Sequence, residues 1–87
     1  MTVVLHRNFR KGLENLTSNQ KKRVGEILQL FKDNPYDPQL KNHALHGKQK
    51  GLRAIYAGGD LRLVFKEEND CQRVIFVRVG THNQVYE

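Results

Sequence analysis

Apolar residues in the first part of the chain recur at intervals that predict one strand and two helices. Residues 2–5 form a short β-branched run, which fits an edge strand. Apolar side chains repeat at helical spacing over residues 8–16 and again, as an i, i+3, i+4, i+7 stripe, over residues 24–31. Thr17 or Ser18 can cap the second helix, which we expect to end near Asp33.

The second part of the chain changes from helical spacing to alternation. Residues 33–51 contain two prolines and many turn-forming residues, which predicts a long loop. Three strand-like segments follow at residues 52–57, 61–67 and 72–79, joined by short turns, and Gly80 is read as the break after the last strand. The whole chain, residues 1–87, is therefore predicted to be a single α+β domain. It has a short N-terminal strand, a two-helix hairpin and a three-stranded antiparallel meander, with the helices on one sheet face.

Alternation also assigns side chains to the two faces of the sheet. In the segment Leu61–Glu67, Arg62 and Lys66 alternate with apolar residues and therefore lie on the face opposite the helices. We expect this face to be partly open and basic, with contributions from Arg53 and Arg78. Paired guanidinium groups on neighbouring strands suit a phosphate group, although each arginine taken alone fits a solvated strand residue equally well.

Composition narrows the class of partner. The chain has 15 Lys and Arg against nine Asp and Glu, a net charge of +6, which favours polyanions such as nucleic acid. A single cysteine, Cys71, excludes an internal disulfide and suits a reducing cytoplasm. We find no apolar run of membrane-spanning length. His43 and His46 with His82 and Cys71 make a weak metal signal, so we expect no metal and no cofactor.

Two stretches in the second half resemble a known family. GDLRLVFK followed by VIFVRVGTHNQVY is similar to the RelE/ParE superfamily of toxins, and the predicted order of elements agrees over essentially the whole chain. NHALHGKQKGLRAIYAGGDLRLVF resembles the YafQ-like branch of that family. The resemblance implies a toxin of a type II toxin–antitoxin system. Such a toxin is a metal-independent endoribonuclease that cleaves mRNA on the ribosome by 2′-hydroxyl attack, leaving a 2′,3′-cyclic phosphate and a 5′-hydroxyl end.

The same resemblance assigns catalytic roles to residues near the end of the chain. His82 matches the histidine of the closing G-T-H motif and is expected to be the general acid, because imidazole exchanges protons near neutral pH. Arg62 matches the arginine of the R-L-V-[YF] motif and is expected to stabilise the charge that develops on phosphorus, with Arg78 assisting.

The general base and the RNA contacts stay open at this point. His43 and Asp60 both match residues of the YafQ-like pattern, and either can take the 2′-hydroxyl proton. Tyr86 can stack on a nucleobase or pack against the sheet edge. Tyr56 stands where the branch has a second catalytic histidine, so it either supplies a hydroxyl or fills the core. The residues expected to bind RNA are Arg53, Tyr56, Lys66, Lys48 and Lys50.

The resemblance also implies partners. A basic toxin is expected to be neutralised by a cognate antitoxin, an acidic and partly disordered protein that folds onto it, and to act on a ribosome with mRNA in the decoding site. No membrane partner is expected. Two other classes fit the same sequence: a ParE-like inhibitor of DNA gyrase, and a basic nucleic-acid or protein-binding module without catalysis.

Overall fold

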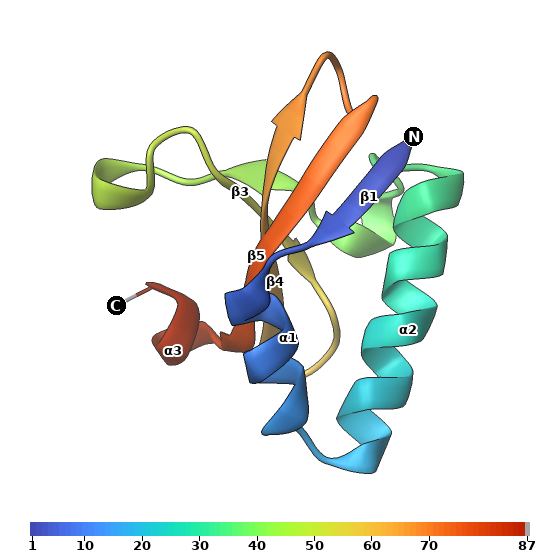
Figure 1. The fold of residues 1–87 in the computed structure, drawn as a ribbon, viewed down its shortest axis with the longest axis vertical. Coiled ribbons are helices and arrows are strands. Elements are labelled where there is room, and N and C mark those ends of the chain that lie inside the picture. The colour runs from blue at the N-terminus through green and yellow to red at the C-terminus, as the bar shows by residue number, and fades with distance from the viewer. Residues whose placement is uncertain (87) are drawn as a thin grey trace.

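A mixed sheet with helices against it forms the molecule (Figure 1). The computed structural model describes residues 1–86, apart from the side chains of Gln84 and Tyr86. The sheet has five strands in the order β1-β5-β4-β3-β2, with β1 parallel to β5 and every other pair antiparallel. The elements in chain order, with 3₁₀ helices marked η, are β1 Thr2–Leu5, α1 Arg7–Glu14, α2 Ser18–Asp33, η1 Pro38–Leu40, β2 His43–Ala44, η2 Gly47–Gln49, β3 Arg53–Tyr56, β4 Leu61–Glu68, β5 Arg73–Thr81 and α3 His82–Tyr86.

The two predicted helices are confirmed, and local capping explains where the second begins. Thr17 caps α2: its side chain accepts a hydrogen bond from the backbone N–H of Gln20, whose side chain accepts one from the Thr17 N–H. This reciprocal pair satisfies two backbone donors that a helix start otherwise leaves without partners. None of the helices within residues 1–86 is long and apolar enough to cross a bilayer.

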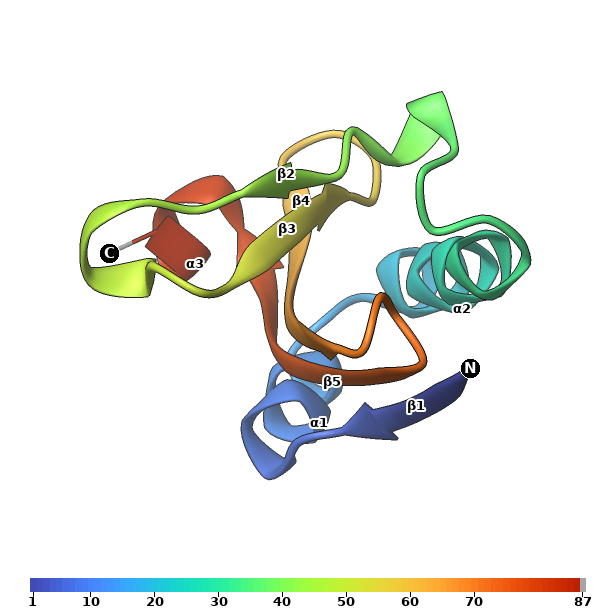
Figure 2. The ribbon, with the colours of Figure 1, turned by 90° about the horizontal axis from the view of Figure 1, so that it is seen from above.

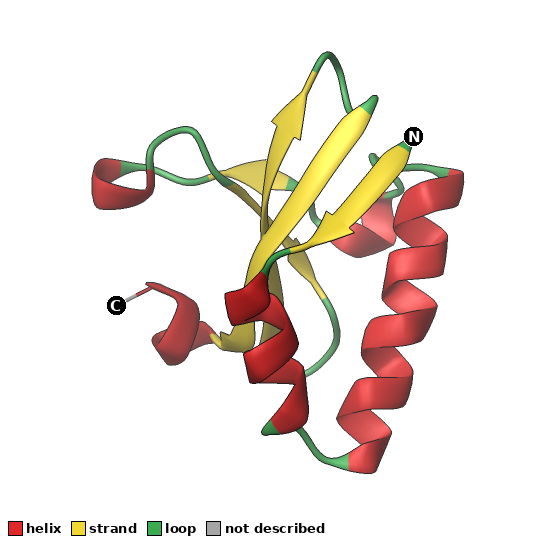
Figure 3. Ribbon diagram, in the orientation of Figure 1, coloured by secondary structure: helices red, strands yellow, loops and turns green. Residues whose placement is uncertain are grey.

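Two parts of the sequence interpretation are wrong. The segment 33–51 is not a continuous loop, because it contains η1, η2 and the two-residue strand β2, which extends the meander through pairing with β3 (Figure 3). Gly80 is not a break either. It is buried inside β5, directly opposite Arg62, and the chain continues into α3. Both features depend on pairing with residues distant in sequence, which local turn chemistry does not report.

The main core lies between the sheet and the first two helices. Phe9 of α1 and Phe31 of α2 meet Phe65 and Phe76 of the sheet, and ring centroids in this group lie 5.0–5.6 Å apart. Seen from above, α2 and α3 lie on opposite sides of the strands (Figure 2), and the buried residues of α1 and α2 belong to one apolar cluster. The prediction that the helical hairpin covers one sheet face is therefore confirmed.

The opposite face carries a second, smaller apolar cluster. Val85 of α3 packs with Leu45, Ala54 and Val64, all of them buried. The expectation that this face is largely open is therefore only partly correct, because α3 and the segment around η2 cover part of it (Figure 1). The part of this sheet face that α3 and the η2 segment leave uncovered carries polar residues of β3, β4 and β5.

Two helical glycines give a matched test of the packing between α1 and β5. A Cβ atom at Gly12 would lie 2.8 Å from the Val79 carbonyl oxygen, whereas one at Gly25 in α2 would meet nothing within 4 Å. We expect Gly12→Ala to lower the free energy of unfolding by about 1–3 kcal/mol, because helix and strand must separate. Gly25→Ala should instead raise it by about 0.5–1 kcal/mol. Urea denaturation of the two variants measures both changes, and equal effects would contradict the close approach.

Candidate active site

Strand register brings several of the predicted residues onto one face. His43, Ala54, Val64 and Arg78 are paired in a row across β2, β3, β4 and β5. The next row pairs Tyr56 with Arg62 and Arg62 with Gly80. Residues directly opposite each other on neighbouring strands project to the same face, so the imidazole, the phenol and both guanidinium groups lie on the side of the second apolar cluster.

The ring of Tyr56 organises two of the positive charges. The guanidinium carbon of Arg62 and the Nζ atom of Lys41 each lie 4.8 Å from the centroid of this ring. Neither cation forms a salt bridge with a carboxylate among the described residues. Two like charges beside one ring repel each other, so an anion bound between them would relieve that repulsion as well as attract both.

The turn between β3 and β4 holds the Arg62 side chain and the backbone of His82 at the same end of the sheet. Arg62 donates hydrogen bonds to the carbonyl oxygens of Gly59, at 3.2 Å, and Leu61, at 3.0 Å. The backbone N–H of His82 donates to the carbonyl oxygen of Asp60 at 2.8 Å. The side chains of His82 and Asp60 are exposed. This turn thus sets the backbone positions of His82, the predicted acid, and of Asp60, one candidate base.

Arg78 is held by a residue that sequence reasoning missed. Its guanidinium donates to Oε1 of Gln49, and Nε2 of Gln49 donates to the Val85 carbonyl oxygen at 2.9 Å. Gln49 therefore ties η2 to both β5 and α3. Lys41 was missed as well, and since both residues lie in the segment read as a loop, no periodic signal marked either of them.

One ring nitrogen of His43 is assigned by its neighbour. Nδ1 lies 2.8 Å from the Lys41 carbonyl oxygen, and a carbonyl only accepts, so Nδ1 carries the proton. In the neutral ring Nε2 is then the unprotonated nitrogen, and it is therefore the atom that can accept a proton.

Arg53 does not join this face, contrary to expectation. It is paired with Phe65, on the helix-covered side, and its Nε donates to Oδ1 of Asn42 at 2.8 Å. The strand alternation that places Tyr56 on one face places Arg53 three residues earlier on the other.

The other predicted contacts are more scattered. Lys66 is exposed on the same face of β4 as Arg62 but four residues further along it, and Lys48 and Lys50 are exposed in and after η2. The Tyr86 prediction concerns a side chain outside the described part of the structure.

Cys71 lies outside this group, in the turn between β4 and β5. It is only 5% exposed, and its thiol donates to Oε2 of Glu67 at 2.8 Å. Burial, together with that hydrogen bond, raises the pKa of Cys71 to about 11 from an ordinary 9.0. Burial and the nearby Cys71 also raise the pKa of Tyr36. Among residues whose side chains are described, no three of the His, Cys, Asp and Glu type gather as a metal site would require.

The raised pKa of Cys71 predicts an alkaline loss of stability. A folded-state pKa above the unfolded one means that the contribution is complete below about pH 9 and is lost as pH rises towards about 11. We expect the free energy of unfolding to fall across this window by about 2 kcal/mol more in the wild type than in Cys71→Ala. Denaturant titrations at several pH values measure the difference. If the two proteins differed by the same free energy of unfolding at every pH, the raised pKa of Cys71 would be contradicted.

Comparison with solved structures finds the same fold in two toxins. YafQ from Escherichia coli strain BL21(DE3) superposes with a TM-score of 0.82 at 20% identity, covering 98% of this chain and 97% of that one. A YoeB/ParE toxin from Agrobacterium tumefaciens gives 0.77 at 16% identity, covering 94% and 99%. These two likenesses show the fold. A search of curated proteins found no match.

A more similar sequence comes from Helicobacter pylori. A copper-bound mutant toxin from this organism is 31% identical, with a TM-score of 0.70 and coverage of 99% of both chains. The family model described as "Bacterial toxin of type II toxin-antitoxin system, YafQ" matches residues 1–87. With the histidines and arginines of the sequence motifs on this fold, the chain belongs to the YafQ family of toxins of bacterial type II toxin–antitoxin systems.

Proposed function

We propose that this toxin is an endoribonuclease that cleaves mRNA on the ribosome. The observation that carries the proposal is the shared face of His43, Arg62 and Arg78, next to the turn that anchors the His82 backbone. A phosphodiester cleaved by its own 2′-hydroxyl needs a base, cations around the phosphoryl oxygens and an acid. This face offers all three types of group.

In the proposed reaction each step has an assigned side chain. His43, through Nε2, or the Asp60 carboxylate removes the proton of the 2′-hydroxyl, whose oxygen then attacks the adjacent phosphorus. Arg62 and Arg78 stabilise the added negative charge on the phosphoryl oxygens. The bond from phosphorus to the 5′-oxygen breaks as His82 donates a proton to that oxygen. The products are a 2′,3′-cyclic phosphate and a 5′-hydroxyl end.

The test uses purified wild-type toxin and translating ribosomes. We expect cleavage of ribosome-bound mRNA, with cyclic phosphate ends detected by their resistance to a phosphatase until acid hydrolysis opens the ring to a monoester. The proposed steps use side chains only, so cleavage should persist when the toxin alone is treated with EDTA and the chelator is removed before the ribosomes are added. This test matters because a copper-bound and a metal-bound toxin structure are known from Helicobacter pylori. Intact mRNA together with arrested DNA supercoiling would favour gyrase inhibition instead.

We also propose an antitoxin partner that covers the basic face. Escherichia coli YafQ forms a complex with the antitoxin DinJ. For this chain the net charge of +6 favours an acidic partner, since oppositely charged surfaces accelerate association. Co-expression of the neighbouring small open reading frame, followed by co-purification in low and high salt, tests this. A salt-insensitive complex would contradict the electrostatic argument.

A further inference from the structure

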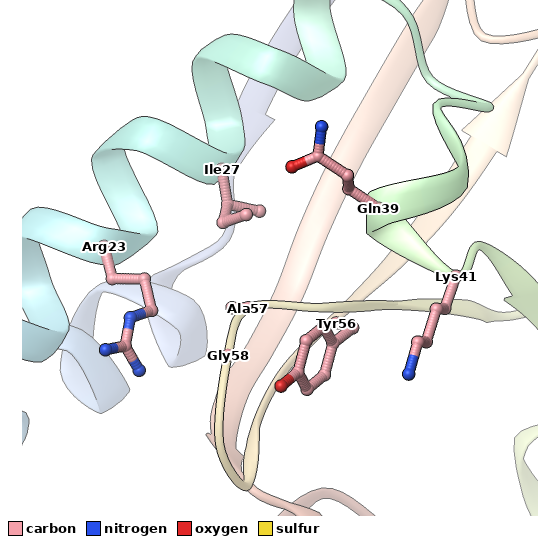
Figure 4. Close-up of a pocket in the computed structure, with 7 residues that line it drawn as sticks. All are labelled: Arg23, Ile27, Gln39, Lys41, Tyr56, Ala57 and Gly58. Atoms are coloured by element: carbon pink, nitrogen blue, oxygen red, sulfur yellow. The ribbon is translucent and has the colours of Figure 1, made fainter.

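A pocket borders the candidate active site where α2 approaches the end of β3. It has a volume of about 360 Å³ and is lined by residues of α2, of η1 and the position after it, and of the end of β3 and the turn that follows, namely Arg23, Ile27, Gln39, Lys41, Tyr56, Ala57 and Gly58 (Figure 4). This volume lies in the range of small-ligand sites. Two of its residues, Lys41 and Tyr56, also belong to the face described above, so pocket and candidate active site are continuous.

The chemistry of the lining suits a nucleotide. Ile27, Ala57 and the Tyr56 ring supply apolar surface, which fits the flat faces of a base. Arg23 and Lys41 stand on opposite sides of the opening and can neutralise a phosphate, while the Gln39 amide offers both a donor and an acceptor to a base edge (Figure 4).

We propose that this pocket holds the nucleotide next to the cleaved phosphate, with its base against Tyr56. The inference rests on the proposed function, because it takes the scissile phosphate to lie at Arg62. The guanidinium of Arg62 and the ammonium of Lys41 each lie 4.8 Å from the centroid of the Tyr56 ring, so this ring contacts both the cation assigned to the reacting phosphate and a cation of the pocket. An acidic peptide would satisfy the cations but would not need the planar aromatic wall.

Two matched pairs of variants test the pocket. Gln39 is exposed, so Gln39→Trp can place an indole in the pocket without disturbing the core, whereas Gln29→Trp introduces the same side chain at an exposed position of α2 that does not line the pocket. Arg23→Glu reverses a charge of the lining, and Lys22→Glu makes the same change at the neighbouring exposed position, which does not line this pocket. We expect Gln39→Trp and Arg23→Glu to weaken RNA binding about tenfold and their controls to change it less than about threefold.

Binding is measured with a single-stranded hexanucleotide carrying 2′-O-methyl groups, which cannot be cleaved. NMR titration follows Ala57, Gly58 and the Ile27 methyl groups in the wild type and the affinity in each variant. Unmoved signals, or equal affinities within each pair, would overturn the inference. So would pocket variants that weaken binding of a glutamate-rich peptide but not of RNA. If RNA binds in the pocket but ribosome-bound mRNA stays intact, the pocket is an RNA-binding site and the proposed endoribonuclease activity is rejected.

Discussion

His82→Ala is expected to lower the rate of mRNA cleavage on ribosomes by about 10²- to 10⁴-fold, the usual contribution of a positioned general acid. The 5′-oxygen is a poor leaving group unless it receives a proton as the bond to phosphorus breaks. His82 is exposed, and its backbone is fixed to the Asp60 carbonyl oxygen whatever side chain follows. The substitution should therefore leave the fold intact. Single-turnover cleavage of a defined mRNA measures the loss, and thermal denaturation checks the stability.

A modified substrate separates proton donation from a structural role. When sulfur replaces the 5′-oxygen, the leaving group departs as a thiolate and needs no proton. His82→Ala should then cleave this substrate nearly as fast as the wild type does. The control is His46→Ala, an exposed histidine that precedes η2 and has no proposed role, which should cleave both substrates at the wild-type rate. A His82→Ala defect of equal size on both substrates would argue against general acid catalysis.

The helices were predictable because their signals are local. Thr17, one of the two expected caps, and the apolar stripe of α2 lie within one short stretch of sequence, and both are found. The alternation of Leu61, Leu63 and Phe65 with Arg62 likewise predicted which residues of β4 face the helical hairpin, although Val64 on the other face is buried as well, in the second apolar cluster. In both cases neighbouring positions contain enough information to determine which side of the element faces the core.

The candidate site was predictable only in part because strand register is not local. Arg62 and Arg78 fall on one face as expected, but this depends on a β-bulge that shifts the pairing between Val64 and Phe65. The two-residue strand β2, which places His43 in the row with Arg78, exists through its pairing with β3. Gln49 reaches Arg78 across 29 positions of sequence. No periodicity reports such contacts.

Arg62→Ala should lower cleavage by about 10²- to 10³-fold, the typical loss when one donor that stabilises a developing oxyanion is removed. Two backbone carbonyl oxygens hold the Arg62 guanidinium in place by accepting its hydrogen bonds. Among the described residues, no carboxylate forms a salt bridge with it. Arg62→Lys keeps the charge but loses the planar fork, so we expect activity between that of the wild type and that of Arg62→Ala. Arg73→Ala is the matched control, because this exposed arginine pairs with Glu68 at the far end of the same two strands and should cleave normally.

The ratio of two kinetic effects decides how Arg62 acts. A group that stabilises only the transition state lowers the cleavage rate at saturating ribosomes and leaves substrate binding almost unchanged, whereas a group that binds the ground state raises the half-saturating concentration. We expect the first pattern for Arg62, since its guanidinium is already held beside Tyr56 before RNA arrives. Arg62→Ala should also be non-additive with Arg78→Ala, because both would act on the same phosphoryl group. Two fully additive losses, or a loss confined to binding, would show that Arg62 attracts RNA rather than stabilising the reaction.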